Sequence, residues 1–194
     1  MKKWLIPIGI IIVLIILIAS PYNSLVDNEE NAEQAWNNVE SSYQRRNDLI
    51  GNLVKTVEGA ADFERGTLTD VIEARAKATS VNVDASNLDA AQIQQFQEAQ
   101  QGVTSALSRL LVTVERYPDL KANQNFLQLQ SQLEGTENRI NVARDRFNEA
   151  VATYEKSRRK FPSNITAALF GFDEMDGFEA DAGAEDAPDV EFDF

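Results

Sequence analysis

The segment 32–57 reads AEQAWNNVESSYQRRNDLIGNLVKTV and decides the fold. Its apolar residues recur at alternating steps of four and three, and Arg46 fills the one position of the series that is not apolar. This spacing keeps one seam of a long helix facing partner helices, as in coiled-coil-like bundles. The apolar members of the seam are Ala32, Trp36, Val39, Tyr43, Ile50, Leu53 and Val57, and the series continues to Ala60.

Two further stretches, 93–117 and 126–154, repeat the same spacing. No segment of the sequence shows strand alternation bounded by hairpin turns. We therefore predict an all-α fold in which three long helices form an elongated antiparallel bundle over 23–162. The second seam contains Ile93, Phe96, Gln100, Val103, Leu107, Leu110, Val114 and Tyr117. The third contains Phe126, Leu129, Leu133, Thr136, Ile140, Ala143, Phe147, Ala150 and Tyr154.

Turn and capping residues mark the helix boundaries. The first helix is predicted over about 25–78, with a break near Gly66, and the polar stretch 79–87 is predicted as a loop. Short connections make the second and third helices antiparallel neighbours. The boundary signals are Ser24-x-x-Asp27, Ser86-x-x-Asp89, Pro118 and Pro162.

An uncharged stretch, LIPIGIIIVLIILIAS over 5–20, precedes the bundle. With its neighbours it reaches the roughly 17 to 25 residues that span a bilayer. We predict a retained single-pass signal-anchor over 1–22, followed by the bundle. The predicted anchor residues are Lys2 and Lys3 on the cytoplasmic side, Trp4 and Tyr22 at the interfaces, and Leu5, Ile12 and Leu17 in the apolar stretch.

Charge at the two ends of this stretch predicts its orientation. Lysines precede it and acidic residues follow it, so the positive-inside rule places the N-terminus in the cytoplasm and exports the bundle across a bacterial inner membrane. The alternative is a cleaved signal peptide, whose apolar core runs about 7 to 15 residues and ends in a small-x-small site. Ile18-Ala19-Ser20 matches such a site poorly.

Composition narrows the classes of function. The chain has no cysteine and no histidine, which removes disulfides, thiolate chemistry and the usual general base. No nucleophile–base pair, phosphate loop or metal-ligand cluster is visible. A net charge of -13 opposes binding to nucleic acid. We therefore predict no enzymatic activity, cofactor, metal, nucleic acid or small-molecule substrate.

Three strings carry a family resemblance: RRNDLI at 45–50, YPDLKAN at 117–123 and LEGTENRI at 133–140. With them the sequence resembles the LemA family over nearly the whole body. The resemblance implies an N-terminal membrane helix, an antiparallel bundle of long helices and no known catalytic activity. It also implies a neighbourhood of membrane proteases or other membrane partners, and for one branch a part in forming organelle membranes.

The chain departs from the family pattern at two positions and in the tail. Gly51 stands where the family usually has proline, so a local bend is less enforced. Phe63 stands where the family often has histidine, so no role of that histidine transfers. The acidic sequence beyond Glu179 has no family counterpart that we can match.

Arg45, Arg46 and Asp48 stand out because Arg46 falls on the apolar seam. A buried charge is costly unless it is paired, and either Glu137 or Glu40 offers a partner. One interpretation is an ion pair that fixes the register of the helices, and the other is a site that binds a partner protein.

The segment 163–194 is predicted as an acidic C-terminal tail, since 161–194 holds ten acidic and no basic residues. Such composition favours disorder. Phenylalanines interleaved with the acids are predicted contacts to a partner, or to a neighbouring subunit where the tail is ordered. They are Phe170, Phe172, Phe178, Phe192 and Phe194.

Two hypotheses for function follow. The first is a structural scaffold, anchored in the lipid bilayer, that forms homo-oligomers through surfaces such as the Gln-rich face 92–101. The other interpretation is a solvated helix surface, which is what polar helix faces usually are. The second is an adaptor or regulator of a membrane-associated protease or another membrane protein.

Overall fold

The computed structural model describes residues 5–59, 63–85 and 88–179, and within 5–17 the side chain of Ile8 alone. All regular elements in these ranges are helices, which confirms the all-α prediction. They are α1 (Leu5–Glu58), α2 (Arg65–Ser80), α3 (Ala90–Val114), α4 (Pro118–Lys121), α5 (Gln124–Arg159) and α6 (Ser163–Phe170).

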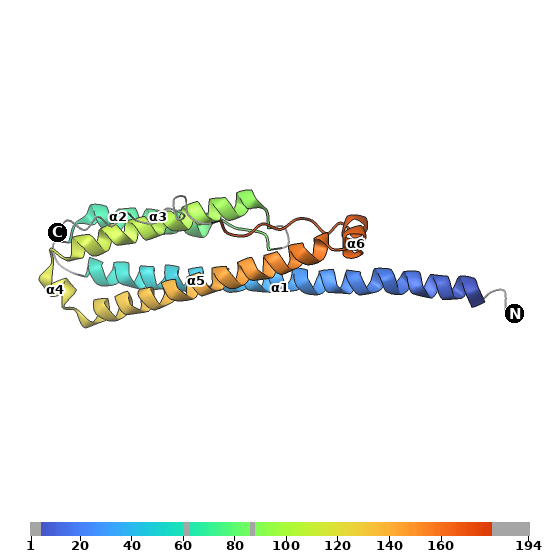
Figure 1. The fold of residues 1–194 in the computed structure, drawn as a ribbon. Coiled ribbons are helices and arrows are strands. Elements are labelled where there is room, and N and C mark those ends of the chain that lie inside the picture. Colours follow the sequence, from blue (N-terminus) through green and yellow to red (C-terminus); the bar gives the residue numbers. More distant parts are fainter. Residues whose placement is uncertain (1–4, 60–62, 86–87, 180–194) are drawn as a thin grey trace, which may run out of the picture.

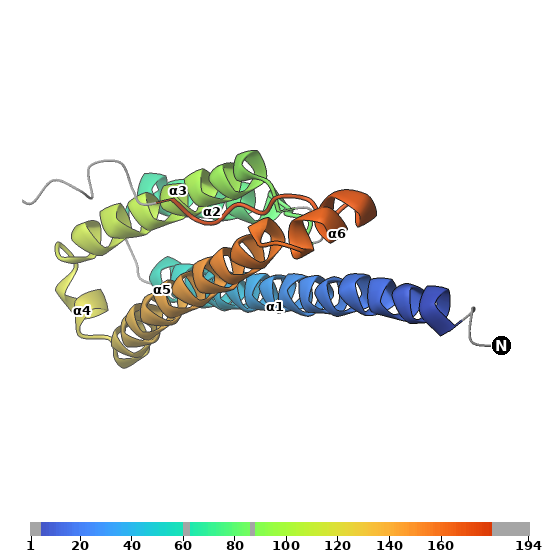
Figure 2. The same cartoon turned by 45° about the vertical axis from the view of Figure 1, so that its right-hand side comes forward.

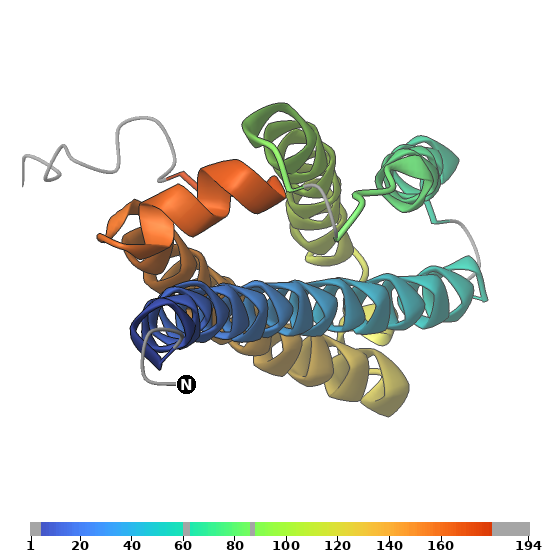
Figure 3. The same cartoon turned by 90° about the vertical axis from the view of Figure 1, so that its right-hand side faces the viewer.

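The four longer helices run up and down in two pairs. α1 packs against α5, and α2 packs against α3 (Figures 1 and 3). α1 extends past the others at its N-terminal end, and α6 lies at that same end against α1 and α5 (Figure 1). The buried residues form two apolar clusters, one around Ile50 and Leu53 and the other around Trp36 and Phe147.

The prediction of three long helices is wrong for the first of them. α1 ends at Glu58 and α2 begins at Arg65, so the break predicted near Gly66 is present, and it separates two helices instead of bending one. The turn lets Leu68, Val71 and Ala78 of α2 become buried, which a straight helix would leave in water. The second predicted helix consequently packs most closely on α2, and not on the third as we expected.

α1 is also longer at its beginning than predicted. It is helical through Pro21, and the predicted cap at Ser24 lies inside it. Proline in a helix interior removes one hydrogen bond and costs about 3 kcal/mol. Packing in the turn after Pro21 offsets this loss, because Leu25 is fully buried and the Tyr22 ring contacts Phe170 and Phe172.

Side-chain caps begin the other long helices. Asp89 accepts a hydrogen bond from the Gln92 N–H and caps α3, while the predicted cap Ser86 lies outside the described residues. Asn123 accepts from the Asn125 and Phe126 amides and caps α5. Pro118 opens α4, where its missing N–H costs nothing.

Gly51 does not interrupt α1. A Cβ atom there would lie 3.5 Å from the guanidinium carbon of Arg75, so the glycine leaves room for this α2 side chain to lie against α1. Arg75 Nε donates to the Asn47 carbonyl at 2.9 Å. The small residue therefore helps to join the two helix pairs.

The predicted disorder of the tail is wrong for 163–179. After α6 the chain returns along the bundle in extended form, and Met175 and Phe178 are buried in the core. Asn148 holds Phe178 by two hydrogen bonds, one from the Phe178 N–H at 2.8 Å and one to its carbonyl at 3.1 Å. These aromatic contacts lie within one chain.

The predicted anchor remains a prediction. In the part of the chain that the structure describes, no helix combines the length and the apolar character needed to cross a membrane. Lys2, Lys3 and Trp4 lie outside the described residues, and so do the side chains of Leu5, Ile12 and Leu17.

Candidate functional site

A groove runs between α3 and α5. α4 bridges these two helices and holds their ends apart (Figures 1 and 2). Two hollows, of about 200 Å³ and 340 Å³, open between them. Arg46, Thr104 and Glu137 line both hollows, so we define the α3–α5 groove as the two hollows together with these shared residues.

Arg46 forms the floor of the groove. Its side chain comes from α1, is only 3% exposed and reaches acceptors on two other helices. Nη1 donates to Glu137 Oε2 and to Thr104 Oγ1, both at 3.2 Å. Nη2 donates to Gln100, at 2.6 Å to Oε1 and at 3.3 Å to the carbonyl oxygen. One guanidinium thus joins α1, α3 and α5.

The two halves of the groove differ in polarity. Near α4 the walls are apolar and are formed by Val103, Leu107, Leu111 and Leu133. Toward α6 the lining is polar and includes Gln97, Gln101, Asn141 and Arg144. A groove with an apolar end and a polar end suits an amphipathic protein segment.

Comparison with known proteins gives the family. A family-level comparison matches residues 35–192 to the LemA family. The chain belongs to the LemA family. The match also corrects our expectation that the tail beyond Glu179 has no family counterpart, since it extends to residue 192.

Several curated bacterial proteins are similar to this LemA-family chain. Magnetosome protein MamQ of Magnetospirillum gryphiswaldense is 28% identical over 176 residues, which cover 81% of this chain and 64% of MamQ. Magnetosome protein MamQ 2 of Paramagnetospirillum magneticum is 26% identical over the same shares. Protein LemA of Metamycoplasma hominis is 22% identical and covers 75% of this chain and 63% of its own length. The chain thus spans just under two thirds of these relatives, and none of their names denotes an enzyme.

The structure brings together two of the site residues that we predicted from the sequence and separates the others. Arg46 pairs with Glu137, whose side chain is 47% exposed, and not with Glu40. Arg45 and Asp48 are exposed, and Asp48 lines a different hollow with Gly51 and Arg75. Phe170 and Phe172 contact Tyr22, Phe178 lies in the core, and Phe192 and Phe194 lie outside the described residues.

Sequence reasoning missed two contributors to this site in the LemA-family chain. Gln100 occupies a seam position of the second helix, where a polar residue is as unusual as Arg46 is in the first. Two polar exceptions on facing seams are a signal of mutual pairing. Thr104 carries no such signal, because an isolated threonine on a helix is common.

An acidic cluster lies at the other end of the bundle, near α6. Partial burial raises the pKa of Glu29, and the charges of Glu33, Asp173 and Glu30 raise it further. Burial also raises the pKa of Tyr154 to about 12, with a further contribution from the Glu29 charge. The Tyr154 hydroxyl donates to the Asp173 carbonyl at 2.7 Å, which holds the returning tail against α5. In the described ranges, no group of three or more acidic side chains is arranged to hold a metal ion.

Glu29→Gln is expected to stabilise the chain slightly at neutral pH. A carboxyl pKa raised by folding means that the folded state favours the protonated form, so the ionised group opposes folding above its unfolded pKa of about 4.3. We expect the melting temperature to rise by about 1 °C at pH 7, because the side chain keeps much of its solvation. The gain should vanish below pH 4.

Thermal unfolding followed by circular dichroism at pH 7 and pH 3.5 measures this effect. Glu73→Gln on the exposed face of α2 is the matched control. An equal gain from Glu29→Gln at both pH values would show that charge at this position is irrelevant to stability.

Proposed function

We propose that this LemA-family protein is a membrane-anchored, non-enzymatic scaffold that assembles with copies of itself at a bacterial membrane. The α3–α5 groove is the observation that carries the proposal. The apolar stretch over 5–20 and the similarity to magnetosome proteins support the membrane part of it. The chemistry of the groove supports a protein partner.

The apolar end of the groove favours a helix or an extended segment as its occupant. Leu107, Leu111 and Leu133 form a wall, and Leu127 lies on the same face of α5 as Gln130 and Glu134, which line the hollow. Leu127 is exposed, so the apolar surface continues beyond the hollow itself. Exposed apolar surface that adjoins a groove is typical of protein–protein contacts.

The polar end supplies specificity. Gln97, Gln100 and Gln101 belong to the Gln-rich face of α3, and Asn141 and Arg144 face them from α5. Amide side chains both donate and accept, so the exposed Asn141 at this end can pair with an amide of a second copy. Such a surface suits assembly between copies of one chain.

The alternative is an adaptor that presents a client, or a regulator of a membrane-associated protease. The same groove supports this alternative, because an amphipathic segment of another protein can pack against its apolar end and hydrogen-bond to its polar end. The two readings differ in the composition of the particle, and one measurement separates them.

The experiment is extraction of the full chain from its native membrane in mild detergent, followed by size exclusion with light scattering and mass spectrometry. We expect a large particle made only of this chain. Leu127→Asp, at the rim of the groove, should reduce the particle mass, while Val142→Asp, which is exposed on α5 and lines neither hollow, should not. A monomer-sized particle contradicts the scaffold, and a stoichiometric second membrane protein favours the adaptor.

A further inference from the structure

α6 exposes an apolar face of unusual density. Ile165 and Leu169 lie four residues apart in α6, so they share one side of that helix, and Phe161 lies just before its first turn. Phe161 is 80% exposed and Leu169 is 68% exposed. Ile165 and Phe170 are also more than half exposed. A patch this apolar on a short element marks an interaction surface.

The opposite side of α6 is fixed to the bundle. Thr166 and Ala167 are buried, and α6 packs against both α1 and α5. Gly171 adopts a left-handed conformation with φ 76°, and its N–H and that of Phe172 both donate to the Ala167 carbonyl. This end of the helix is held in place, so the apolar face stays turned outward.

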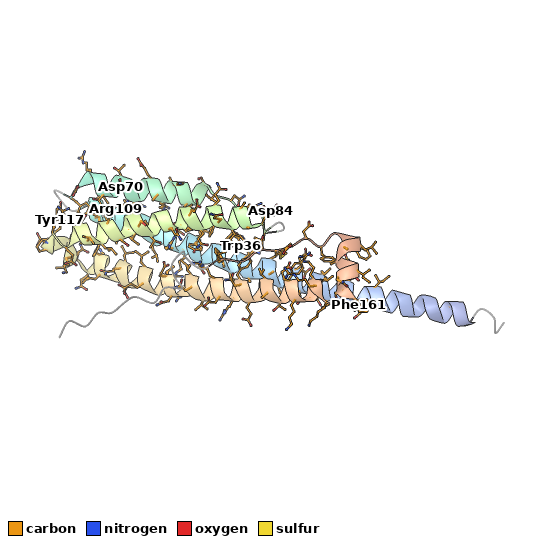
Figure 4. All side chains as sticks on the ribbon, turned by 45° about the horizontal axis from the view of Figure 1, so that its top comes forward. Trp36, Asp70, Asp84, Arg109, Tyr117 and Phe161 are labelled. Carbon is orange, nitrogen blue, oxygen red and sulfur yellow. The ribbon has the colours of Figure 1, made fainter. Side chains whose placement is uncertain are left out.

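α6 lies across the end of the bundle from which α1 emerges. Figure 3 views this end and shows α6 beside the projecting part of α1. In Figure 4 Phe161 lies at this end, while Tyr117 lies at the opposite end. The ring centroids of Tyr22 in α1 and Phe170 lie 5.0 Å apart. Ile18, one helical turn before Tyr22, is exposed. The apolar face of α6 thus continues the surface that leads into 5–20.

Charges of both signs lie beside α6, because the acidic cluster around Glu29 and two exposed lysines are at the same end of the bundle. Lys156 and Lys160, in the last turns of α5 and next to Phe161, are exposed. Long basic side chains beside apolar residues extend toward headgroups while their stems stay apolar. Glu174 pairs with Arg158 and Arg159 at 3.3 Å and 3.0 Å, which offsets its repulsion of anionic lipids.

We infer that α6 is an interfacial membrane element that seats the bundle on the bilayer surface beside the anchor. Its occupant is lipid at headgroup depth, because the exposed face adjoins the segment that we propose to enter the membrane. This inference rests on the proposed membrane anchoring. Two attachments at one end of the bundle, the anchor and α6, would restrict its tilt and so present the α3–α5 groove at a fixed orientation to neighbouring copies.

The absence of cysteine in the chain makes a direct test possible, since a single introduced cysteine carries the only label. Leu169→Cys, Ile8→Cys and Val112→Cys are each labelled with a polarity-sensitive fluorophore in the full chain, in phosphatidylcholine vesicles. All three side chains are exposed, so the substitutions are expected to preserve the fold. Val112, which is 73% exposed on α3, is the matched control in water.

Quenching by spin-labelled lipids then reports the depth of each label. We expect a lipid with a shallow spin label to quench Leu169→Cys several-fold more than Val112→Cys, and a deep spin label to quench Ile8→Cys. If Ile8→Cys is quenched and Leu169→Cys behaves like Val112→Cys, α6 does not contact lipid and the inference is overturned while the anchor stands. If Ile8→Cys is not quenched, the anchoring itself fails. A blue shift of the Leu169→Cys label without lipid quenching would indicate a second copy on this face and would also overturn the inference.

Discussion

Trp36→Ala is expected to destabilise the bundle by about 4 kcal/mol, within the range for removing a large buried aromatic side chain. Trp36 is fully buried at the point where α1, α3, α5 and the returning tail meet. Its ring centroid lies 5.3 Å from Phe96, 5.2 Å from Phe147 and 5.8 Å from Phe178. Removing it would leave a cavity that no single helix can close by a small shift.

The measurement is denaturant unfolding of the detergent-solubilised full chain, followed by far-ultraviolet circular dichroism. Trp36→Phe should lower the free energy of unfolding by less than half as much as Trp36→Ala, because it retains an aromatic ring in the cluster. Val142→Ala, on an exposed face of α5, should change stability by less than about 0.5 kcal/mol. A loss below 1 kcal/mol for Trp36→Ala would mean that the four aromatic rings do not stabilise one another across the helices.

The same substitution tests the connection between the core and the tail. Phe178 stacks on Trp36 and is held at its backbone by Asn148. Loss of the tryptophan ring removes one of the aromatic rings against which Phe178 packs. Backbone amides of 172–179 should therefore exchange with solvent faster in Trp36→Ala than in Trp36→Phe, even under conditions where both variants remain folded.

Heptad spacing predicted the helical fold because burial follows the seam closely. The seven apolar residues of the first seam that the structure describes are all buried, and so are Ile93, Val103 and Leu110 of the second. The pattern is local, because the burial of each seam residue can be predicted from the apolar residues three and four positions away. No knowledge of distant contacts is needed to read it.

The order of the tail and the packing of α2 could not be predicted in this way, because distant contacts decide both. The acidic composition of 161–194 favours disorder on average, yet Phe178 packs against both Trp36 and Phe147. Similarly, the packing of α2 depends on its finding buried positions against α3. Neither fact is contained in the local spacing of residues.

Arg46→Ala is expected to cost about 3 kcal/mol, because it removes a buried side chain and leaves Gln100 without its guanidinium partner. Arg46→Met should cost much less, below about 1 kcal/mol. Methionine fills most of the same volume, and replacing a buried charge by an apolar side chain is often neutral or stabilising. Denaturant unfolding of both variants beside the wild-type chain measures the difference.

Arg46→Met also separates the two interpretations of this residue that the sequence left open. If Arg46 fixes the register of α1 against α3 and α5, an entirely apolar seam permits competing alignments, and the near-ultraviolet dichroism of the aromatic cluster should weaken. If Arg46 instead serves a partner, the spectrum should match the wild type while the particle mass in detergent falls. Glu137→Gln provides the control, because it removes the charge at the rim of the groove and leaves the buried guanidinium bonded to Gln100 and Thr104. A wild-type spectrum together with a wild-type particle mass in Arg46→Met would contradict both interpretations and leave Arg46 as a packing residue alone.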